Sequence, residues 1–305
     1  MIEKADVWNN ALEVMQAYTP FYQKEAVQEI ADAHAQDVWF ALLLARGAEP
    51  QLFNLDYLQK INPYGSPSRL SDIIATAAEK KFLRGHESGS YHLTAKGKAV
   101  LDSFFDKAHV LLAAAPSLPE AQINTVVSSL AKIVAATESA PEPVDKSTLA
   151  SSRWTDPKEN AQANLRIDQY ITDLLRYRDD AHRAAWQPAG LSGIEWETLT
   201  FVWNDEAHTA SELVEKLERR GYSEADYQAA LDRLVTRQWL QRVNGQYQLT
   251  AEGRQVREDA EVETDRLFYL GWFALDEHEL AALDQLLQEL AALLKESVAA
   301  EPVAA

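Results

Sequence analysis

The feature that most constrains this chain is a phrase that occurs twice. Residues 88–100 are SGSYHLTAKGKAV and residues 244–256 are NGQYQLTAEGRQV, so both contain Tyr-x-Leu-Thr-Ala-x-Gly. Each copy follows an aromatic-leucine pair and leads into a stretch of helical periodicity. Further along, residues 117–136 and 274–293 are also alike, each a capped helix start followed by apolar residues at helical spacing. Two copies of one folding unit are therefore expected.

A linker is expected between the two copies. Residues 137–160 are rich in proline, serine and charge, and they show neither the helical nor the strand period. A chain of 305 residues is long enough for two domains of ordinary size. We therefore predict a first unit over 1–136, a linker over 137–160, a second unit over 161–296 and a disordered tail over 297–305, each unit including flanking helices.

The elements of the second unit follow from periodicity, capping and turn residues. Helices are predicted over 165–186 and 194–203, and a third begins at Thr209. Ser223 is the predicted N-cap of the next helix, whose buried face comprises Tyr227, Ala230, Leu231 and Leu234. Asn244-Gly245 then joins two short extended runs. Since this pair tolerates the positive φ angles of a type I′ turn, it predicts a hairpin.

The first unit follows the same order. Helices are expected over 55–64 and 67–81, the latter burying Leu70, Ile73, Ile74 and Ala77, with a hairpin around RGHESGS. In the repeated phrase, Thr94 and Thr250 are predicted N-caps, and Gly97 and Gly253 let a helix start close to neighbouring backbone. Three helices followed by a hairpin form a winged helix-turn-helix. The predicted fold is mainly α, with two tandem winged helix-turn-helix units, each of three helices plus a two-stranded wing.

The chain resembles the MarR-like winged helix-turn-helix proteins in its wing phrase, Tyr-x-Leu-Thr-x-x-Gly-Arg/Lys, and in the long helices that follow. Residues 165–294 also resemble a poorly characterised bacterial, actinobacterial-type helix-turn-helix family through YRDDAHRAAW, RGYSEADYQAALDRL and ETDRLFYLGWFALDEHELAAL. The resemblance implies that the additional long helices form an intramolecular pseudo-dimer bundle. It also implies transcription regulation, by a monomer with a pseudo-two-fold repeat or by a homodimer, and it supplies no reaction.

Charge distinguishes the two units. The net charge of −18 argues against indiscriminate nucleic-acid binding, because the field of the whole chain repels phosphate. Residues 258–301 carry twelve acids and two bases, whereas residues 55–100 carry seven bases and four acids. A specific DNA contact is therefore better supported in the first unit than in the second.

In a winged helix, the third helix enters the major groove and the wing contacts phosphate. In the first unit this predicts a DNA-binding surface made of Ser68, Arg69, Ser71, Lys80, Lys81, Arg84, His86, Lys96 and Lys98. The alternative is a solvated face of mixed charge. The second unit instead places Glu224 and Asp226 at its helix tip, with Arg233, Arg237 and Arg242 behind them. Contact with a protein partner, or pairing with the first unit, explains that surface equally well.

A ligand site is a further hypothesis. Arg178, His182 and Trp186 share a helical stripe, and with Trp203 and Trp272 nearby they could hold a small acidic ligand. The alternative is a helix packed in the bundle, with its charges in i,i+4 pairs and its aromatic residues in an ordinary core.

Enzyme signatures are missing from the sequence. DEHEL at 276–280 is not the His-Glu-x-x-His metal motif, RGHESGSY is not a P-loop, and there is no Gly-x-Gly-x-x-Gly. The absence of cysteine excludes disulfides and zinc-thiolate sites. We expect no catalytic residues, no metal and no cofactor. The longest apolar run, at 38–45, is too short to span a bilayer, and the first residues lack signal-peptide order, so a cytoplasmic protein without a membrane partner is expected.

The function predicted from the sequence is that of a DNA-binding, transcription-regulator-like protein without catalytic activity. The alternative is a winged-helix scaffold that binds a protein partner or a small acidic ligand without binding DNA. The charge of the third helix in each unit separates the two, because the first unit favours DNA and the second favours the scaffold.

Overall fold

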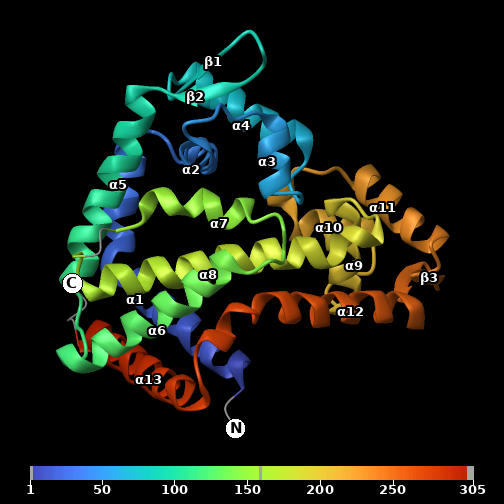
Figure 1. Ribbon diagram of the computed structural model, residues 1–305. Coiled ribbons are helices and arrows are strands. Elements are labelled where there is room, and N and C mark those ends of the chain that lie inside the picture. Colours follow the sequence, from blue (N-terminus) through green and yellow to red (C-terminus); the bar gives the residue numbers. More distant parts are fainter. Residues whose placement is uncertain (1–2, 158–159, 301–305) are drawn as a thin grey trace.

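The computed structural model describes residues 3–157 and 160–300. Within them the chain forms thirteen α-helices and two antiparallel two-stranded hairpins (Figure 1). The first half comprises α1 (Lys4–Asp32), α2 (Trp39–Ala48), α3 (Leu55–Ile61), α4 (Pro67–Glu79), β1 (Leu83–Gly85), β2 (Tyr91–Leu93), α5 (Ala95–Ala113) and α6 (Glu120–Ser139).

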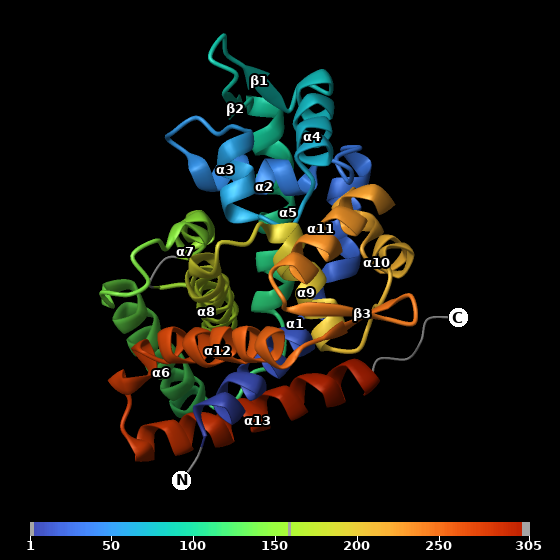
Figure 2. The ribbon, with the colours of Figure 1, turned by 90° about the vertical axis from the view of Figure 1, so that its right-hand side faces the viewer.

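The second half repeats this order of elements. After the short helix α7 (Ser147–Ser152) it comprises α8 (Ala163–Trp186), α9 (Gly193–Trp203), α10 (Ala210–Lys216), α11 (Glu224–Thr236), β3 (Leu240–Val243), β4 (Gln246–Leu249), α12 (Ala251–Phe268) and α13 (Glu277–Ala300). Four 3₁₀ turns lie at Arg153–Thr155, Gln187–Ala189, Glu218–Arg220 and Gly271–Ala274. The hairpins lie at the positions expected for wings, and they project from different sides of the molecule (Figures 1 and 2).

The repeated phrase forms the same local structure in both halves. The hydroxyls of Thr94 and Thr250 accept the N–H of Gly97 and Gly253 at 3.1 and 3.0 Å, so the two predicted N-caps are confirmed. A Cβ atom on Gly253 would lie 2.1 Å from the carbonyl oxygen of Trp239, and on Gly97 2.4 Å from that of Phe82. Only glycine fits there, because each helix begins directly against the chain that enters the hairpin.

The second hairpin turns as its sequence predicts. Asn244 and Gly245 both have positive φ angles, 53° and 84°, as a type I′ turn requires. Ser223 caps α11, as predicted, by accepting the N–H of Asp226. In the first half, α3 ends at Ile61 rather than at residue 64, since Pro63 disfavours a helical conformation at Asn62.

The segment expected to be a linker is largely structured. Helix α6 runs three residues into it, and α7 packs against both α8 and α2. The backbone N–H groups of Thr148 and Leu149 donate to the carboxylate of Asp180 on α8, at 2.9 and 2.8 Å. Residues 158 and 159 lie outside the described part. Helix α13 continues to Ala300, into the expected tail, whose last residues, 301–305, also lie outside it.

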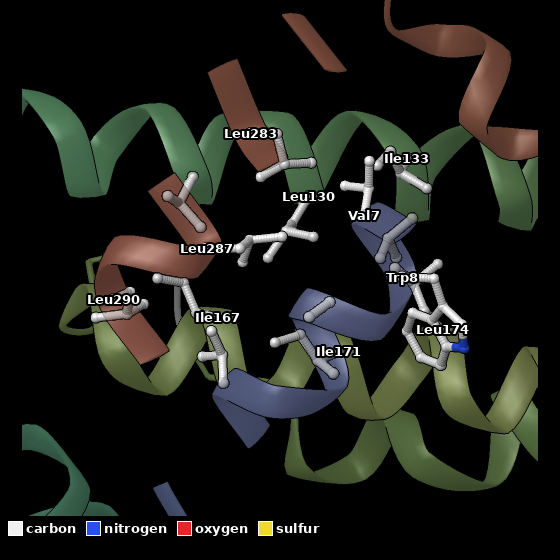
Figure 3. Close-up of a cluster of buried hydrophobic side chains, with 14 of the residues drawn as sticks. Val7, Trp8, Leu130, Ile133, Ile167, Ile171, Leu174, Leu283, Leu287 and Leu290 are labelled. Atoms are coloured by element: carbon white, nitrogen blue, oxygen red, sulfur yellow. The ribbon is translucent and has the colours of Figure 1, made fainter. Parts of the chain in front are cut away.

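The long helices pack across the two halves as well as within them. Helix α1 of the first half packs against α13 of the second, α8 of the second packs against α6 of the first, and α6 also contacts α13. Their buried faces form one shared apolar core, in which the rings of Trp8 and Phe268 lie 5.0 Å apart. Figure 3 shows Leu130 of α6 directed toward Val7 of α1 and Leu287 of α13. Two smaller cores hold α2–α4 and α9–α11 with their hairpins.

Replacement of Leu130 by alanine should therefore destabilise both halves together. The side chain is fully buried in the shared core, so its truncation should lower the free energy of unfolding by about 2–5 kcal/mol. Urea unfolding and amide hydrogen exchange in α4 and α11 measure the effect. Val262→Ala, at a side chain 71% exposed, should change stability by less than about 0.5 kcal/mol. Loss of amide protection in the first half alone would contradict the shared core.

Candidate functional site

The expected recognition helix of the first half presents an exposed face. Ser66 caps α4 by accepting the N–H of Arg69 at 3.2 Å, and Pro67 occupies the first turn, where its missing N–H costs nothing. Ser68, Arg69 and Ser71 are all exposed, while Leu70 and Ile74 face the core. Ala77 is buried with them, but Ile73, which was also expected to be buried, is only half-buried. The sequence pattern therefore assigned the two faces of this helix correctly except at Ile73.

Some of the basic residues expected to contact DNA are bonded to other protein groups, and some are not. Lys80 pairs with Asp37 at 2.6 Å, Lys98 pairs with Glu49 at 2.8 Å, and Lys96 donates to the carbonyl oxygen of Lys80 at 2.9 Å. The rings of His86 and His92 are joined by a 2.7 Å contact between nitrogens. By contrast, the charged groups of Arg69, Lys81 and Arg84 are exposed and make no hydrogen bond or ion pair with the described residues.

The bases at the corresponding surface of the second half are all engaged. Arg233 donates to Glu195 at 2.6 Å, Arg237 donates to the carbonyl oxygens of Ala189 and Gly190, and Arg242 contacts the Tyr247 hydroxyl and, at 3.7 Å, Asp232. Glu224 and Asp226 remain exposed at the tip of α11. Hydrogen bonds from the hydroxyl and backbone N–H of Ser223 lower the pKa of Asp226. This tip is therefore anionic.

The turns that precede α4 and α11 contact each other. The N–H of Ser66 donates to the carbonyl oxygen of Arg220 at 2.8 Å, and the Tyr222 hydroxyl donates to that of Gly65 at 3.3 Å. A Cβ on Gly221 would lie 2.7 Å from that of Arg69. Symmetric helix-turn-helix dimers place two recognition helices about 34 Å apart to enter successive major grooves. In this arrangement the tips of α4 and α11 are too close for that.

The residues of the expected acidic-ligand site are dispersed. Arg178 lies 3.7 Å from Asp265 and faces the Phe268 ring, whereas Trp272 is buried in the shared core. Trp186 stacks on Trp196 with a 5.7 Å separation of ring centroids. Trp203 packs under the guanidinium of Arg257. These side chains do not line one cavity.

His182 joins three helices of the second half. The indole N–H of Trp196 donates to its Nε2 at 3.0 Å, so the imidazole proton resides on Nδ1, which lies 3.2 Å from the Thr264 hydroxyl. That hydroxyl donates in turn to the carbonyl oxygen of Ala260. Burial lowers the pKa of His182 to about 4. The ring is therefore neutral and its two nitrogens already have partners on α9 and α12.

A cavity of about 530 Å³ lies between α8 and the first half. Residues from one stripe of α8 line one side: Asp168, Thr172, Arg176, Asp179 and Arg183. Aromatic residues line the other, from α2, the turn after α3, α5 and the 3₁₀ turn after α7: Phe40, Tyr64, Phe104, Phe105 and Trp154. The steps of three and four in the polar stripe are visible in the sequence. They do not show whether such a stripe faces solvent or a cavity.

One charge in this cavity has no partner. Arg183 pairs with Asp180, Arg220 donates to Glu197 at 2.6 Å, and Arg176 lies 3.7 Å from Asp179. No described residue donates a hydrogen bond to the Asp168 carboxylate or forms an ion pair with it. Burial raises the pKa of Asp168 to about 7, and burial together with the Asp168 charge raises that of Tyr22 on α1. Asp168 is therefore a carboxyl group held in an unfavourable environment.

Asp173, a second acid on α8, is buried and has a full set of hydrogen-bond donors. Asp173, one turn further along α8, accepts from the Ser152 hydroxyl at 2.9 Å and the Gln169 amide at 2.7 Å, and it pairs with Arg153. Its pKa is still raised by burial to about 6 although these partners oppose the shift. Asp168 has no such set of donors.

Comparison with known proteins identifies one relationship. The chain matches a helix-turn-helix family over residues 90–301, from the second strand of the first hairpin through α13. The match is not specific to the MarR-like proteins. No curated protein and no solved structure matches the chain. Among the described residues, no helix is both long enough and apolar enough to cross a membrane.

The Asp168→Asn variant should be more stable than the unmodified protein above neutral pH. Because the folded state raises this pKa from 3.8 to about 7, the unmodified protein loses stability as the pH rises between those values. The variant has no charge to bury, so its advantage should be small near pH 4 and grow to roughly 1–4 kcal/mol by pH 8. Denaturant unfolding at both pH values measures it. Asp102→Asn, on the exposed face of α5, is the matched control, and an equal gain there would refute the assignment.

Proposed function

The chain belongs to this helix-turn-helix family, and we propose that it is a DNA-binding protein of the transcription-regulator type. We place the DNA contact in the first half on the charges of α4 and its hairpin, because most of that half lies outside the matched residues 90–301. In this proposal, each half is a winged helix-turn-helix, with α2–α4 and β1–β2 forming one unit and α9–α11 and β3–β4 the other. The long helices form an intramolecular pseudo-dimer, so that a single chain supplies both halves of the bundle.

The observation that carries this proposal is the unequal distribution of unpaired cations. Arg69 lies in the first turn of the exposed face of α4, and Lys81 and Arg84 lie where α4 leads into the first hairpin. Their charged groups are available to phosphate oxygens, since they have no protein partner among the described residues. At the corresponding positions of the second half, Arg233, Arg237 and Arg242 are already bound to carboxylates and carbonyl oxygens, so contact of these three with DNA would have to break those interactions.

The contact between the two helix-turn-helix turns favours a one-sided complex. It brings the acidic tip of α11 beside the tip of α4, where a second recognition helix cannot enter a separate groove. A phosphate approaching that tip would meet Glu224 and Asp226, whose charge repels it. We therefore assign the second half a structural role, orienting α4 and limiting the DNA positions that it can reach.

A one-sided complex has a characteristic salt dependence. Each neutralised phosphate contributes about −0.9 to the slope of log affinity against log salt concentration, so three contacts give a slope of roughly −3. A symmetric protein that used both halves would show a steeper slope. The high negative charge of the chain should also confine binding to low salt unless base contacts from Ser68 and Ser71 add affinity.

Removal of two of the three unpaired cations should weaken DNA binding and flatten its salt dependence. For Arg69→Ala with Arg84→Ala, the slope should fall from roughly −3 to roughly −1, whatever the DNA sequence. Fluorescence anisotropy at several salt concentrations, with duplexes selected from a random pool, measures both quantities. Arg233→Ala with Arg242→Ala removes the same charge from the second half and should change the slope little.

Other outcomes distinguish the alternatives. Equal losses in the two double variants would establish a symmetric protein that contacts DNA with both halves. If the unmodified protein binds no DNA even at low salt, the DNA-binding proposal fails, and the scaffold that binds a protein or small ligand replaces it. Circular dichroism of each variant verifies that the fold is retained, because Arg233 contributes an ion pair to Glu195.

A further inference from the structure

We propose that the cavity between α8 and the first half binds an organic cation, a flat aromatic molecule that carries an amine, with Asp168 as its counter-ion. The proposal is independent of DNA binding, since none of the residues assigned to DNA contact lines this cavity. A volume of about 530 Å³ lies in the range of small-molecule sites, roughly 300–1,000 Å³.

The walls of the cavity suit a flat apolar body. Phe104 and Phe105 on α5 lie with their ring centroids 5.0 Å apart, and the Trp154 ring meets Phe105 edge to face at 4.8 Å. Phe40 and Leu43 of α2 extend this surface. Aromatic side chains bind flat rings by stacking and edge contacts, and their negatively charged faces attract organic cations.

The charged residues that line the cavity favour a positively charged ligand. Its arginines are held by Asp179, Asp180 and Glu197, and burial lowers the pKa of His109, which keeps that ring uncharged. Asp168 is then the one lining charge without a partner among the described residues. An anion would be repelled by it, whereas an ammonium group would pair with it. This is the opposite sign to the ligand suggested by Arg178 and His182 in the sequence.

The environment of Asp168 explains why such a ligand would bind tightly. The Asp168 side chain is half-buried in the cavity wall. A carboxylate partly removed from water without a protein donor is costly, and the cost is present before any ligand arrives. On α1, the Tyr18 hydroxyl is bound to Asn164 at 3.0 Å, so it does not serve as the missing donor. A ligand N–H⁺ would supply a charge-assisted hydrogen bond to this carboxylate, to which the described residues donate none.

A matched set of probes tests the sign. At pH 8, 9-aminoacridine is a flat cation, acridine is its neutral analogue, and acridine-9-carboxylate is an anion of similar shape. Calorimetric titration at about 0.15 M salt, which suppresses non-specific attraction to the acidic surface, should give affinities in the order cation, neutral, anion. Asp168→Asn should weaken binding of the cation by about tenfold or more and leave that of acridine nearly unchanged.

The controls keep the test decisive. Asp102→Asn changes the net charge equally at an exposed position outside the cavity, and it should preserve cation binding. Loss of folding cannot account for a loss of affinity in Asp168→Asn, because that variant should be the more stable one at this pH. If the cation binds both variants equally, its attraction is to the acidic surface and the proposal is wrong. Absence of binding by 9-aminoacridine, or preference for the carboxylate, also overturns it.

Discussion

The packing of long helices across the two halves is the constraint on which the rest of the structure depends. Helix α1 cannot bury its apolar face without α13, and α8 cannot do so without α6, because their inward residues belong to one core. The small cores around α2–α4 and α9–α11 are then attached to a rigid frame. The contact between their turns and the cavity beside α8 are both consequences of where this frame holds them.

Much of the local structure could be predicted from sequence because it depends on neighbours in the chain. Thr94 and Thr250 cap helices, Gly97 and Gly253 permit a close backbone approach, and Asn244-Gly245 forms the turn that its φ preferences allow. Periodicity also identified the inward face of α11, and that of α4 apart from Ile73, which is half-buried. It could not show that α1 packs against α13 and α8 against α6, since an apolar stripe specifies burial and not the surface that covers it.

The functional surfaces depend on pairings between residues far apart in sequence, and these were harder to predict. A count of bases near α4 treats Lys80 and Arg84 alike. In the structure Lys80 forms an ion pair with Asp37, forty-three positions away in the sequence, whereas Arg84 has no partner among the described residues. Arg178 and His182 share a helical stripe in the sequence, but in the structure Arg178 lies beside Asp265 and His182 accepts a hydrogen bond from Trp196. In the sequence Asp168 is one acid among many in a predicted helix. What distinguishes it is that no described residue donates a hydrogen bond to its carboxylate, and that is visible only in the structure.

Both halves belong to one chain, and this has a consequence for how such a molecule can change. In a homodimer every substitution appears twice, so an alteration that suits one surface is also imposed on its symmetric copy. Here Lys96 and Glu252 occupy the same place in the repeated phrase, and each can be exchanged alone. Gly97 and Gly253 are the same residue in both copies, since each is fixed by the same backbone contact. In one chain, positions that the backbone geometry fixes, such as Gly97 and Gly253, stay the same in both halves. Positions that it does not fix, such as Lys96 and Glu252, can differ between the halves.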